Sequence, residues 1–346
     1  MKSLSVMVIE PGVVALREQV LRAPAPGEVL VETSHSTLSP GTERHIILAD
    51  EFKPPLAIGY SLVGCIAAVG PGVTRFQVGD AVAAVAPHAS HVLVDERAVL
   101  PLPVDVDLEQ AAFFVLAHTA LYGIRQARLV FGEAVAIIGQ GIVGLLAARL
   151  AVLAGGVPVI AVDLDETRLA LSRRLGVHEV VHGRDTEGLR SRLRQLPDGG
   201  APVVIEATGA NGPLEQAFEM IAVRGRIVLL GVTHGEDTVP CQRALSWKGA
   251  ALIGAYVNSK PWSLEQTDMQ ITRWPPSLAP GSRAYNGPGV FTSSDDIRVI
   301  FELMRYGRLD LGPVITDRIT PEQVPATYRR VLEQDASLVG AVIRWQ

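Results

Sequence analysis

The chain has 346 residues, of which 48% are hydrophobic and 19% charged, with a formal net charge of −5. This length allows two domains with separate cores, and the acidic balance argues against nucleic acid as the main partner. There are two cysteines, Cys65 and Cys241, and no CxxC pair. The sequence therefore disfavours a disulfide framework, excludes a structural zinc site built from cysteines, and fits a reducing cytoplasm.

The first 112 residues carry short apolar runs separated by glycine and proline. The runs at 29–33 and 62–69 are typical of strands, and Gly70-Pro71-Gly72 is typical of a turn. Residues 1–9 also predict a strand, without the small-residue cleavage site of a signal peptide. Strands at this spacing predict a small, mainly β, barrel-like domain.

From about residue 108 the period changes, and 109–127 predicts a helix. The run 134–162 carries little charge, but its glycines, Arg149 and Pro158 divide it into strand, helix and strand, so we expect no membrane span. Further buried strands are predicted at 203–209, 227–232 and 251–254. With helical patterns between most of them, these strands predict an α/β fold with a doubly wound parallel sheet.

A glycine turn follows the first strand of this sheet, with Gly139, Gly141 and Gly144 in the pattern GxGxxG. The next strand ends on Asp163, 19 residues after Gly144 (163 − 144). Strand, glycine turn, helix, strand and terminal acid together are the dinucleotide-binding fingerprint, in which the pyrophosphate lies at the helix N-terminus. The alternative is a glycine-rich turn in a Rossmann domain that binds no cofactor.

We expect NAD(H) as the cofactor, because a carboxylate at Asp163 accepts hydrogen bonds from a ribose 2′-hydroxyl and repels a 2′-phosphate. Arg168 leaves NADP open, since it lies five residues further on and is able to contact the adenosine side. The expected cofactor-binding residues are Gly139, Gly141, Ile142, Val143, Gly144, Asp163, Leu164, Arg168, Thr208, Gly209, Gly231 and Val232.

The segment after about residue 256 is polar and rich in proline, glycine and aromatic residues. Aromatic faces suit sugar rings or flat conjugated substrates, so Trp262, Trp274 and Tyr285 are candidates to cover a substrate pocket. An oligomer interface or a packed surface loop is the equally supported alternative. Residues 297–346 return to helix and strand patterns.

The order of these parts resembles the medium-chain dehydrogenase/reductase superfamily of alcohol dehydrogenase-like proteins. Besides the glycine turn, the resemblance rests on segments 70–73, 78–82, 206–209 and 225–231 and covers nearly the whole chain. It implies a GroES-like catalytic domain of residues 1–112 and 256–346, interrupted by an NAD-binding Rossmann domain of residues 113–255. It also implies a small-molecule substrate and a homo-oligomer, either a dimer or a tetramer.

The three zinc-ligand positions of the superfamily are occupied here by residues that are poor or impossible zinc ligands. Pro40 stands where zinc-dependent members have cysteine, Tyr60 stands in place of the histidine of Gly-His-Glu, and an approximate alignment puts the third position near Ala112. Proline and alanine side chains do not bind zinc, and a lone tyrosine is a poor substitute. We therefore expect no metal and a zinc-free branch of the superfamily.

Without zinc, another group must exchange a proton with the substrate oxygen. Thr42 and His45 match positions that form a proton relay in some zinc-containing relatives, and Tyr60 is a candidate hydrogen-bond donor, since its reference pKa of about 10 suits a donor better than a base. For each there is a structural alternative: Thr42 closing a turn after Pro40, His45 as an ordinary surface or core histidine, and Tyr60 as a packing residue. A structural role is also expected for Glu43.

Three functions remain at this stage. The first is interconversion of a secondary alcohol, such as a polyol or sugar, and its ketone. The second is reduction of an activated C=C bond, as in zinc-free enoyl and quinone reductases. The third is a non-catalytic NAD-binding protein. Thr42 and His45 favour the first.

Overall fold

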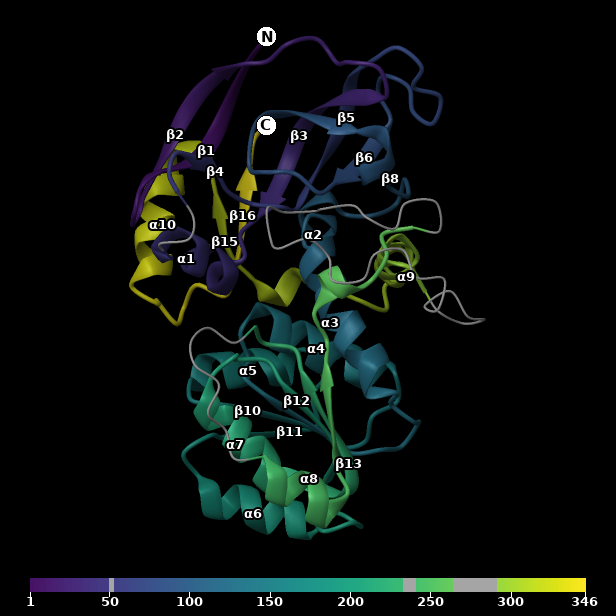
Figure 1. The fold of residues 1–346 in the computed structure, drawn as a ribbon, viewed down its shortest axis with the longest axis vertical. Helices are drawn as coiled ribbons and strands as arrows, with labels where there is room; N and C mark the ends of the chain where they lie inside the picture. The colour runs from purple at the N-terminus through teal and green to yellow at the C-terminus, as the bar shows by residue number, and fades with distance from the viewer. Residues whose placement is uncertain (50–52, 233–240, 264–290) are drawn as a thin grey trace. The chain divides into compact units, whose positions relative to one another are not determined.

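The computed structural model describes residues 1–49, 53–232, 241–263 and 291–346. The chain divides into two compact units, one formed by Met1–Val115 with Lys260–Gln346 and the other by Leu116–Ser259 (Figure 1). These boundaries lie three and four residues after the ones expected from the sequence, 113 and 256. Each unit is described by itself below.

The first unit is built on two sheets. One has the strand order β2-β1-β4, and the other has the order β15-β16-β3-β5-β6-β8, with β7 paired to β3. Most pairs are antiparallel, but β15 and β16, from the returning segment, are parallel. The strands are β1 (Lys2–Glu10), β2 (Val13–Val20), β3 (Glu28–Thr37), β4 (Leu56–Ala57), β5 (Leu62–Val69), β6 (Ala81–Ala84), β7 (His91–Asp95), β8 (Val99–Pro101), β15 (Ile315–Ile319) and β16 (Gly340–Arg344).

Two hydrophobic cores lie in this unit. One fills the barrel-like sheet and includes Val31, Leu62 and Val82. The other joins the N-terminal strands to the C-terminal helix and includes Val6, Ile47 and Tyr328. The second core holds α1 close to α10, which lies nearly 300 residues further along the chain. The helices of this unit are α1 (Pro40–Leu48), α2 (Leu108–Ala111), α9 (Ser293–Arg305) and α10 (Val324–Leu332).

The second unit contains a six-stranded sheet, parallel throughout, in the order β11-β10-β9-β12-β13-β14. Strand order reverses direction between β9 and β12, and open α/β sheets bind ligands at such a switch point. The strands are β9 (Val135–Ile138), β10 (Val159–Asp163), β11 (Glu179–His182), β12 (Ala201–Glu206), β13 (Ile221–Leu229) and β14 (Ala251–Gly254).

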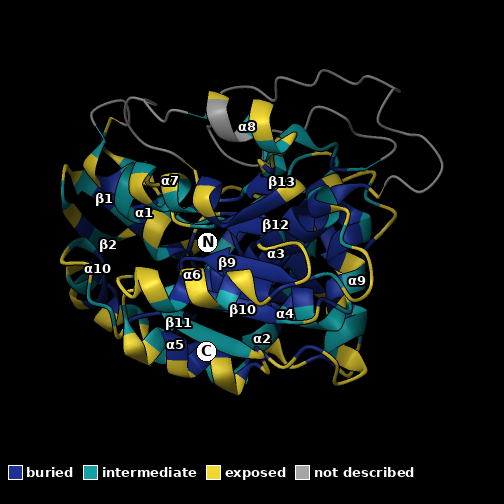
Figure 2. Ribbon diagram, turned by 90° about the horizontal axis from the view of Figure 1, so that it is seen from below, coloured by how far each residue is buried: buried dark blue, intermediate teal, exposed yellow. Residues whose placement is uncertain are grey.

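The central strands are buried on both faces, because helices cover the sheet on each side. Every residue of β9 is buried, as parallel strands between helices require, and Figure 2 shows β9, β10 and β12 in dark blue. The helices are α4 (Ile142–Leu153), α5 (Glu166–Arg174), α6 (Thr186–Arg194), α7 (Asn211–Met220) and α8 (Gln242–Lys248), and α3 (Phe114–Ala127) crosses the boundary between the units. The predicted fold class, a Rossmann sheet inserted in a GroES-like, mainly β domain, is confirmed.

The predicted helix over 109–127 is wrong in one respect, since it is interrupted between α2 and α3. At the interruption the Ser61 hydroxyl donates a hydrogen bond of 2.6 Å to the Ala112 carbonyl, which is the acceptor that a continuous helix uses for its own next turn. Among the described residues, no helix combines the length and apolar character needed to cross a membrane.

Candidate active site and cofactor site

The glycine turn adopts the backbone that the fingerprint predicts. Gly139 has a φ of 90°, in the left-handed region. A Cβ at Gly144 would lie 1.8 Å from the Gly139 carbonyl oxygen, so α4 approaches β9 closely only because position 144 is glycine. The space beside Gly141 is open, since a Cβ added there would meet no other atom within 4 Å, and α4 begins without a side-chain cap. The first N–H groups of α4 therefore remain available to an anion.

Asp163 lies at the carboxyl end of β10 and is tied to the glycine turn. Its Oδ2 accepts a 2.5 Å hydrogen bond from the Gln140 backbone N–H, and its Oδ1 accepts one of 2.9 Å from Asp165 N–H. Each carboxylate oxygen keeps a second lone pair for a ribose hydroxyl. Leu164, next in the chain, is 61% exposed, and Arg168 lies in the first turn of α5.

Two further predicted segments lie side by side at the carboxyl ends of β12 and β13. A Cβ at Gly209 would meet the Val232 carbonyl oxygen at 2.2 Å, and a Cβ at Gly231 would meet the Gly209 nitrogen at the same distance. The two loops therefore touch backbone to backbone. Thr208 belongs to the same group, since a Cβ at Gly139 would lie 2.5 Å from its Cγ2.

Glu206 organises this group, although it was not among the site residues predicted from the sequence. Its buried carboxylate accepts hydrogen bonds from the Thr208 N–H (2.6 Å), the Thr208 hydroxyl and the Gly209 N–H (3.0 Å). Burial raises the pKa of Glu206 above its ordinary value, and the hydrogen bonds from Thr208 and Gly209 offset only part of that rise. The sequence did carry a signal for Glu206, because an acidic side chain at the end of a buried strand needs hydrogen-bond donors nearby.

The hydrogen-bonding groups at this edge of the sheet fit a nicotinamide dinucleotide. The open space at Gly141 and the uncapped start of α4 suit a pyrophosphate, and Asp163 suits a ribose. All of these groups lie within the second unit, at the carboxyl ends of β9 and β10, beside the switch point between β9 and β12.

The predicted catalytic residues lie in the first unit, two of them on α1. Pro40 occupies the first position of this helix, so Thr42 lies in the first helical turn rather than closing an isolated turn. His45 follows three residues later, which places both on the same side of α1. Both are half-buried.

Tyr60 lies beside the start of α1, with the hydroxyls of Ser39 and Thr42 near its phenol. Ser39 is the N-cap residue but makes no side-chain cap bond. Burial raises the pKa of the Tyr60 phenol, the Glu43 charge raises it further, and the bonds with Ser39 and Thr42 lower it only in part. Tyr60 is therefore held as a neutral phenol across the physiological pH range, which is the form that donates a hydrogen bond.

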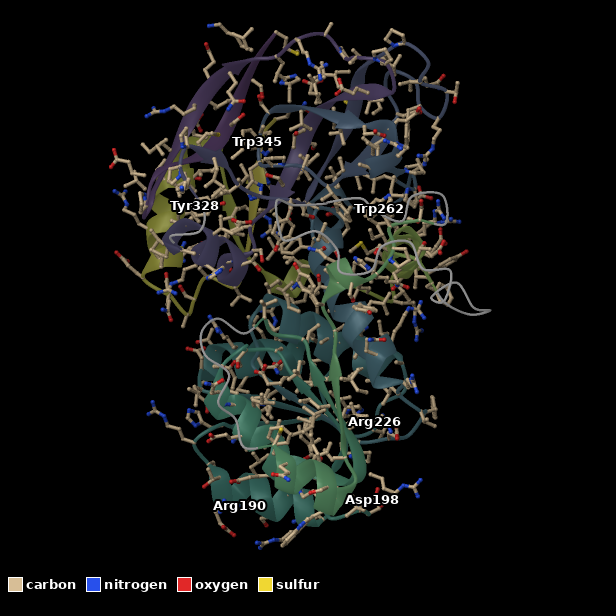
Figure 3. All side chains as sticks on the ribbon, in the orientation of Figure 1. Arg190, Asp198, Arg226, Trp262, Tyr328 and Trp345 are labelled. Atoms are coloured by element: carbon tan, nitrogen blue, oxygen red, sulfur yellow. The ribbon has the colours of Figure 1, made fainter. Side chains whose placement is uncertain are left out.

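Glu43 lies behind Tyr60, with its side chain fully buried. Its Oε2 accepts a 2.5 Å hydrogen bond from the Tyr328 hydroxyl, and its Oε1 accepts one of 3.0 Å from the Ser39 backbone N–H. His88 Nε2 lies 3.3 Å from the same Oε1. The carboxylate thus has three buried polar partners, and Figure 3 labels one of them, Tyr328 on α10.

Further hydrogen bonds extend from Glu43 through His88 to the end of the chain. Trp345 Nε1, which only donates, bonds Ser36 Oγ at 2.9 Å, and Ser36 Oγ lies 2.9 Å from His88 Nδ1. Nothing in the sequence predicted this chain, because its members come from β3, the segment before β7, α10 and the C-terminus.

The residues at the three superfamily zinc positions do not fit a zinc ion. Pro40 begins α1, position 60 carries a phenol, and Ala112 is fully buried with its carbonyl bonded to Ser61. In the part of the chain that the structure describes, no three His, Cys, Asp or Glu side chains are grouped to hold a metal. A tetrahedral site of three nitrogen, sulfur or carboxylate ligands is not formed by these donors.

Trp262, one of the three aromatic residues considered as a pocket cover, is packed into the first unit. It is buried, and its Nε1 donates a 2.9 Å hydrogen bond to the Arg97 carbonyl. Its indole therefore holds this part of the chain against the first unit. Trp274 and Tyr285 lie outside the described residues.

Comparison with known proteins agrees with this architecture. The family model "Alcohol dehydrogenase GroES-like domain" matches residues 25–103, and "Zinc-binding dehydrogenase" matches residues 143–271. The chain is 27% identical to an L-threonine 3-dehydrogenase of Pyrococcus horikoshii over 73% of its length and 82% of the relative's. It is 24% identical to an alcohol dehydrogenase of Cupriavidus necator over 97% of both chains.

Solved structures show the same fold at low identity. The 2R,3R-butanediol dehydrogenase of Bacillus subtilis matches with a TM-score of 0.81 and 18% identity, over 99% of this chain and 100% of that one. Among structures of this fold, one is bound to NADP and another is complexed with NADH, so the fold alone does not choose between the two cofactors.

A GroES-like unit interrupted by a dinucleotide-binding Rossmann unit defines a class of two-unit α/β proteins. The chain belongs to the alcohol dehydrogenase-like medium-chain dehydrogenase/reductase superfamily.

Proposed function

We propose that this protein is an NAD(H)-dependent oxidoreductase that interconverts a secondary alcohol, such as a polyol or sugar, and its ketone without catalytic zinc. The observation that carries the proposal is the position of Tyr60, which stands at a zinc-ligand position beside the start of α1, near Thr42 and the buried Glu43 side chain. The dehydrogenase relatives support the reaction class. The absence of ligating side chains at positions 40 and 112 supports the zinc-free mechanism.

In this mechanism Tyr60 donates a hydrogen bond to the substrate oxygen. During oxidation the alcohol O–H and C–H bonds break, a C=O bond forms, and the proton leaves through Thr42 and His45 to solvent. The bound nicotinamide supplies the acceptor for the hydride, or its donor in the reverse direction. A hydrogen bond to the carbonyl oxygen stabilises the charge that develops there, the part that zinc plays in metal-dependent enzymes.

We expect a preference for NAD(H) over NADP(H) in steady-state kinetics followed by cofactor absorbance. Asp163→Ala removes hydrogen bonds from a charged acceptor and should lower kcat/KM for NAD about 10- to 100-fold, with a smaller loss for NADP. Asp185→Ala, which removes a similar carboxylate from the N-cap of α6, is the matched control. A wild-type enzyme that prefers NADPH would refute the assignment.

We expect purified protein to contain no stoichiometric zinc by elemental analysis, and to keep its activity after dialysis against a chelator. The same preparation should turn over secondary alcohols or ketones in a panel that also contains enones. One zinc per chain would overturn the zinc-free mechanism. Turnover of enones alone would support C=C reduction instead, and tight cofactor binding with no turnover would support a non-catalytic NAD-binding protein.

The expected cytoplasmic location and homo-oligomeric state belong to this proposal as well. The first is supported by the two unpaired cysteines, Cys65 and Cys241.

A further inference from the structure

One peptide group in the second unit has hydrogen bonds on both of its sides. It joins Leu164 to Asp165, immediately after β10, and its N–H donates to Asp163 Oδ1 at 2.9 Å. Its carbonyl oxygen, on Leu164, lies 3.0 Å from His182 Nε2. His182 is the last residue of β11, the strand that pairs in parallel with β10 at the edge of the sheet. The His182 imidazole and the Asp163 carboxylate therefore bond the same peptide group.

The partners of the His182 ring determine where its proton lies. The Arg184 backbone N–H, which only donates, bonds Nδ1 at 3.2 Å, so Nδ1 presents a lone pair. The Leu164 carbonyl only accepts, so the proton is on Nε2. His182 is thus a neutral imidazole that donates to the loop after β10 and accepts from the loop after β11.

The backbone next to His182 is held by other bonds. Gly183 N–H donates to the Asp163 carbonyl at 2.8 Å, and a Cβ at Gly183 would lie 3.1 Å from Leu164 Cδ2. The Gln216 side chain, from α7, donates to the Gly183 carbonyl at 3.2 Å. Because these contacts fix the end of β11 without the imidazole, the ring has a firm base from which to orient the peptide group that it bonds.

A planar peptide group transmits this orientation to Asp163. Since the C=O and N–H of one peptide group lie in one plane, a hydrogen bond that fixes the carbonyl also fixes the N–H. Without the His182 ring, the peptide group between Leu164 and Asp165 is free to rotate and to turn its N–H away from Asp163 Oδ1. Asp163 Oδ2 still accepts from the Gln140 N–H, so the carboxylate keeps one of its two backbone donors and is able to turn about that bond.

We propose that His182 is a positioning residue for the Asp163 carboxylate and thereby strengthens the preference for NAD(H) over NADP(H). The inference rests on the proposed NAD(H) site, in which Asp163 accepts hydrogen bonds from a ribose 2′-hydroxyl and repels a 2′-phosphate. His182 acts through the peptide group and does not itself touch the cofactor. A carboxylate that turns freely binds the hydroxyl less well and avoids a phosphate more easily. Loss of His182 therefore weakens the binding of NADH more than that of NADPH.

Fluorescence titration of the full-length protein with NADH and with NADPH tests this inference. His182→Ala should raise the Kd for NADH about tenfold, because it removes the hydrogen bond that orients the peptide group. The Kd for NADPH should change less, so that the ratio of the two constants moves towards one. His182→Gln should recover most of the affinity for NADH, since its amide also offers one planar group with a donor and an acceptor.

Two further variants separate positioning from a general effect on the strands. His178→Ala is the matched control, because His178 Nδ1 accepts the Val159 N–H at 3.0 Å at the amino end of β10, away from the cofactor-binding residues. It should leave both dissociation constants unchanged. In a double variant with Asp163→Ala, His182→Ala should cause no further loss of NADH affinity, because its effect passes through the missing carboxylate.

Three results would overturn the inference. The first is a His182→Ala protein with an unchanged Kd for NADH, and the second is an equal loss of affinity for NADH and NADPH, which would mean that His182 only holds the loops together. The third is additive losses in the double variant with Asp163→Ala. Failure of the proposed reaction is measured separately, as a lack of turnover by wild-type protein that still binds NADH, whereas a wild type that binds neither nucleotide would overturn both proposals.

Discussion

Tyr60→Phe is expected to lower kcat/KM for alcohol oxidation by about 100-fold or more while leaving the affinity for NAD unchanged. The substitution removes only the hydroxyl that donates to the substrate oxygen in the proposed mechanism, and loss of one such positioned donor costs about 10²- to 10³-fold. The residues proposed to bind NAD lie in the other unit, at the ends of β9, β10 and β12. Steady-state kinetics with a fluorescence titration of NADH binding measures both quantities.

The matched control is Tyr306→Phe, which removes the same hydroxyl from an exposed tyrosine at the end of α9. Thr42→Ala should have a smaller effect than Tyr60→Phe, since it removes one of the two side chains that hold the phenol. A Tyr60→Phe enzyme with wild-type kcat/KM would reduce Tyr60 to a packing residue. The proton-relay proposal would likewise fail if both Thr42→Ala and His45→Ala left turnover unchanged.

The backbone of the glycine turn and the placement of the residues around it were predictable from sequence because they are local. Gly139 to Asp163 form one strand–helix–strand unit, in which spacing alone implies geometry, and strand order then brings Thr208 and Gly231 to the same edge. Each of those residues follows a strand, and parallel strands end at a common edge of the sheet. Glu206 was missed as a site residue because its role is to hold a loop, which composition does not reveal.

The surroundings of Tyr60 were not predictable in the same way. Glu43 and Tyr328 are 285 residues apart, and their contact depends on the packing of α1 against α10. His88 reaches Glu43 partly because position 59 is glycine, where a Cβ would lie 2.3 Å from the imidazole ring. Motifs predicted which groups to consider for the proposed reaction, whereas the Glu43 charge, the second cause of the raised Tyr60 pKa after burial, came from tertiary structure.

Substitutions of Glu43 are expected to separate its two roles, which are to accept buried hydrogen bonds and to raise the pKa of the tyrosines beside it. Glu43→Ala leaves the Tyr328 hydroxyl, the Ser39 N–H and the His88 N–H without their buried acceptor. Since each buried unsatisfied donor costs about 1–3 kcal/mol, we expect a loss of about 3 kcal/mol or more in the free energy of unfolding, measured by urea denaturation at neutral pH. Glu43→Gln keeps an acceptor oxygen and should lose much less.

The neutral variant, Glu43→Gln, instead changes how the free energy of unfolding depends on pH. The pKa values of Tyr60 and Tyr328 are raised above the ordinary 10.0 by burial first and by the Glu43 charge second. A raised phenol pKa in the folded state contributes stability that is present below about pH 10 and is lost as pH rises, because the unfolded chain releases its protons first. Glu43→Gln lowers both folded-state pKa values, so its stability should fall less steeply above pH 10.

Absorbance titration at the phenolate band measures tyrosine ionisation directly. The Glu43→Gln, Tyr60→Phe double variant then shows whether Tyr60 is the tyrosine whose ionisation changes. We expect a tyrosine that ionises earlier in Glu43→Gln than in wild type, and we expect that change to disappear in the double variant to the extent that Tyr60 causes it. The alkaline limb of the activity profile should move to lower pH in parallel, since activity requires the neutral phenol. If the tyrosine titration curve and the alkaline limb of the activity profile are both unchanged while stability falls, Glu43 only joins α1 to α10 and does not affect the ionisation of Tyr60.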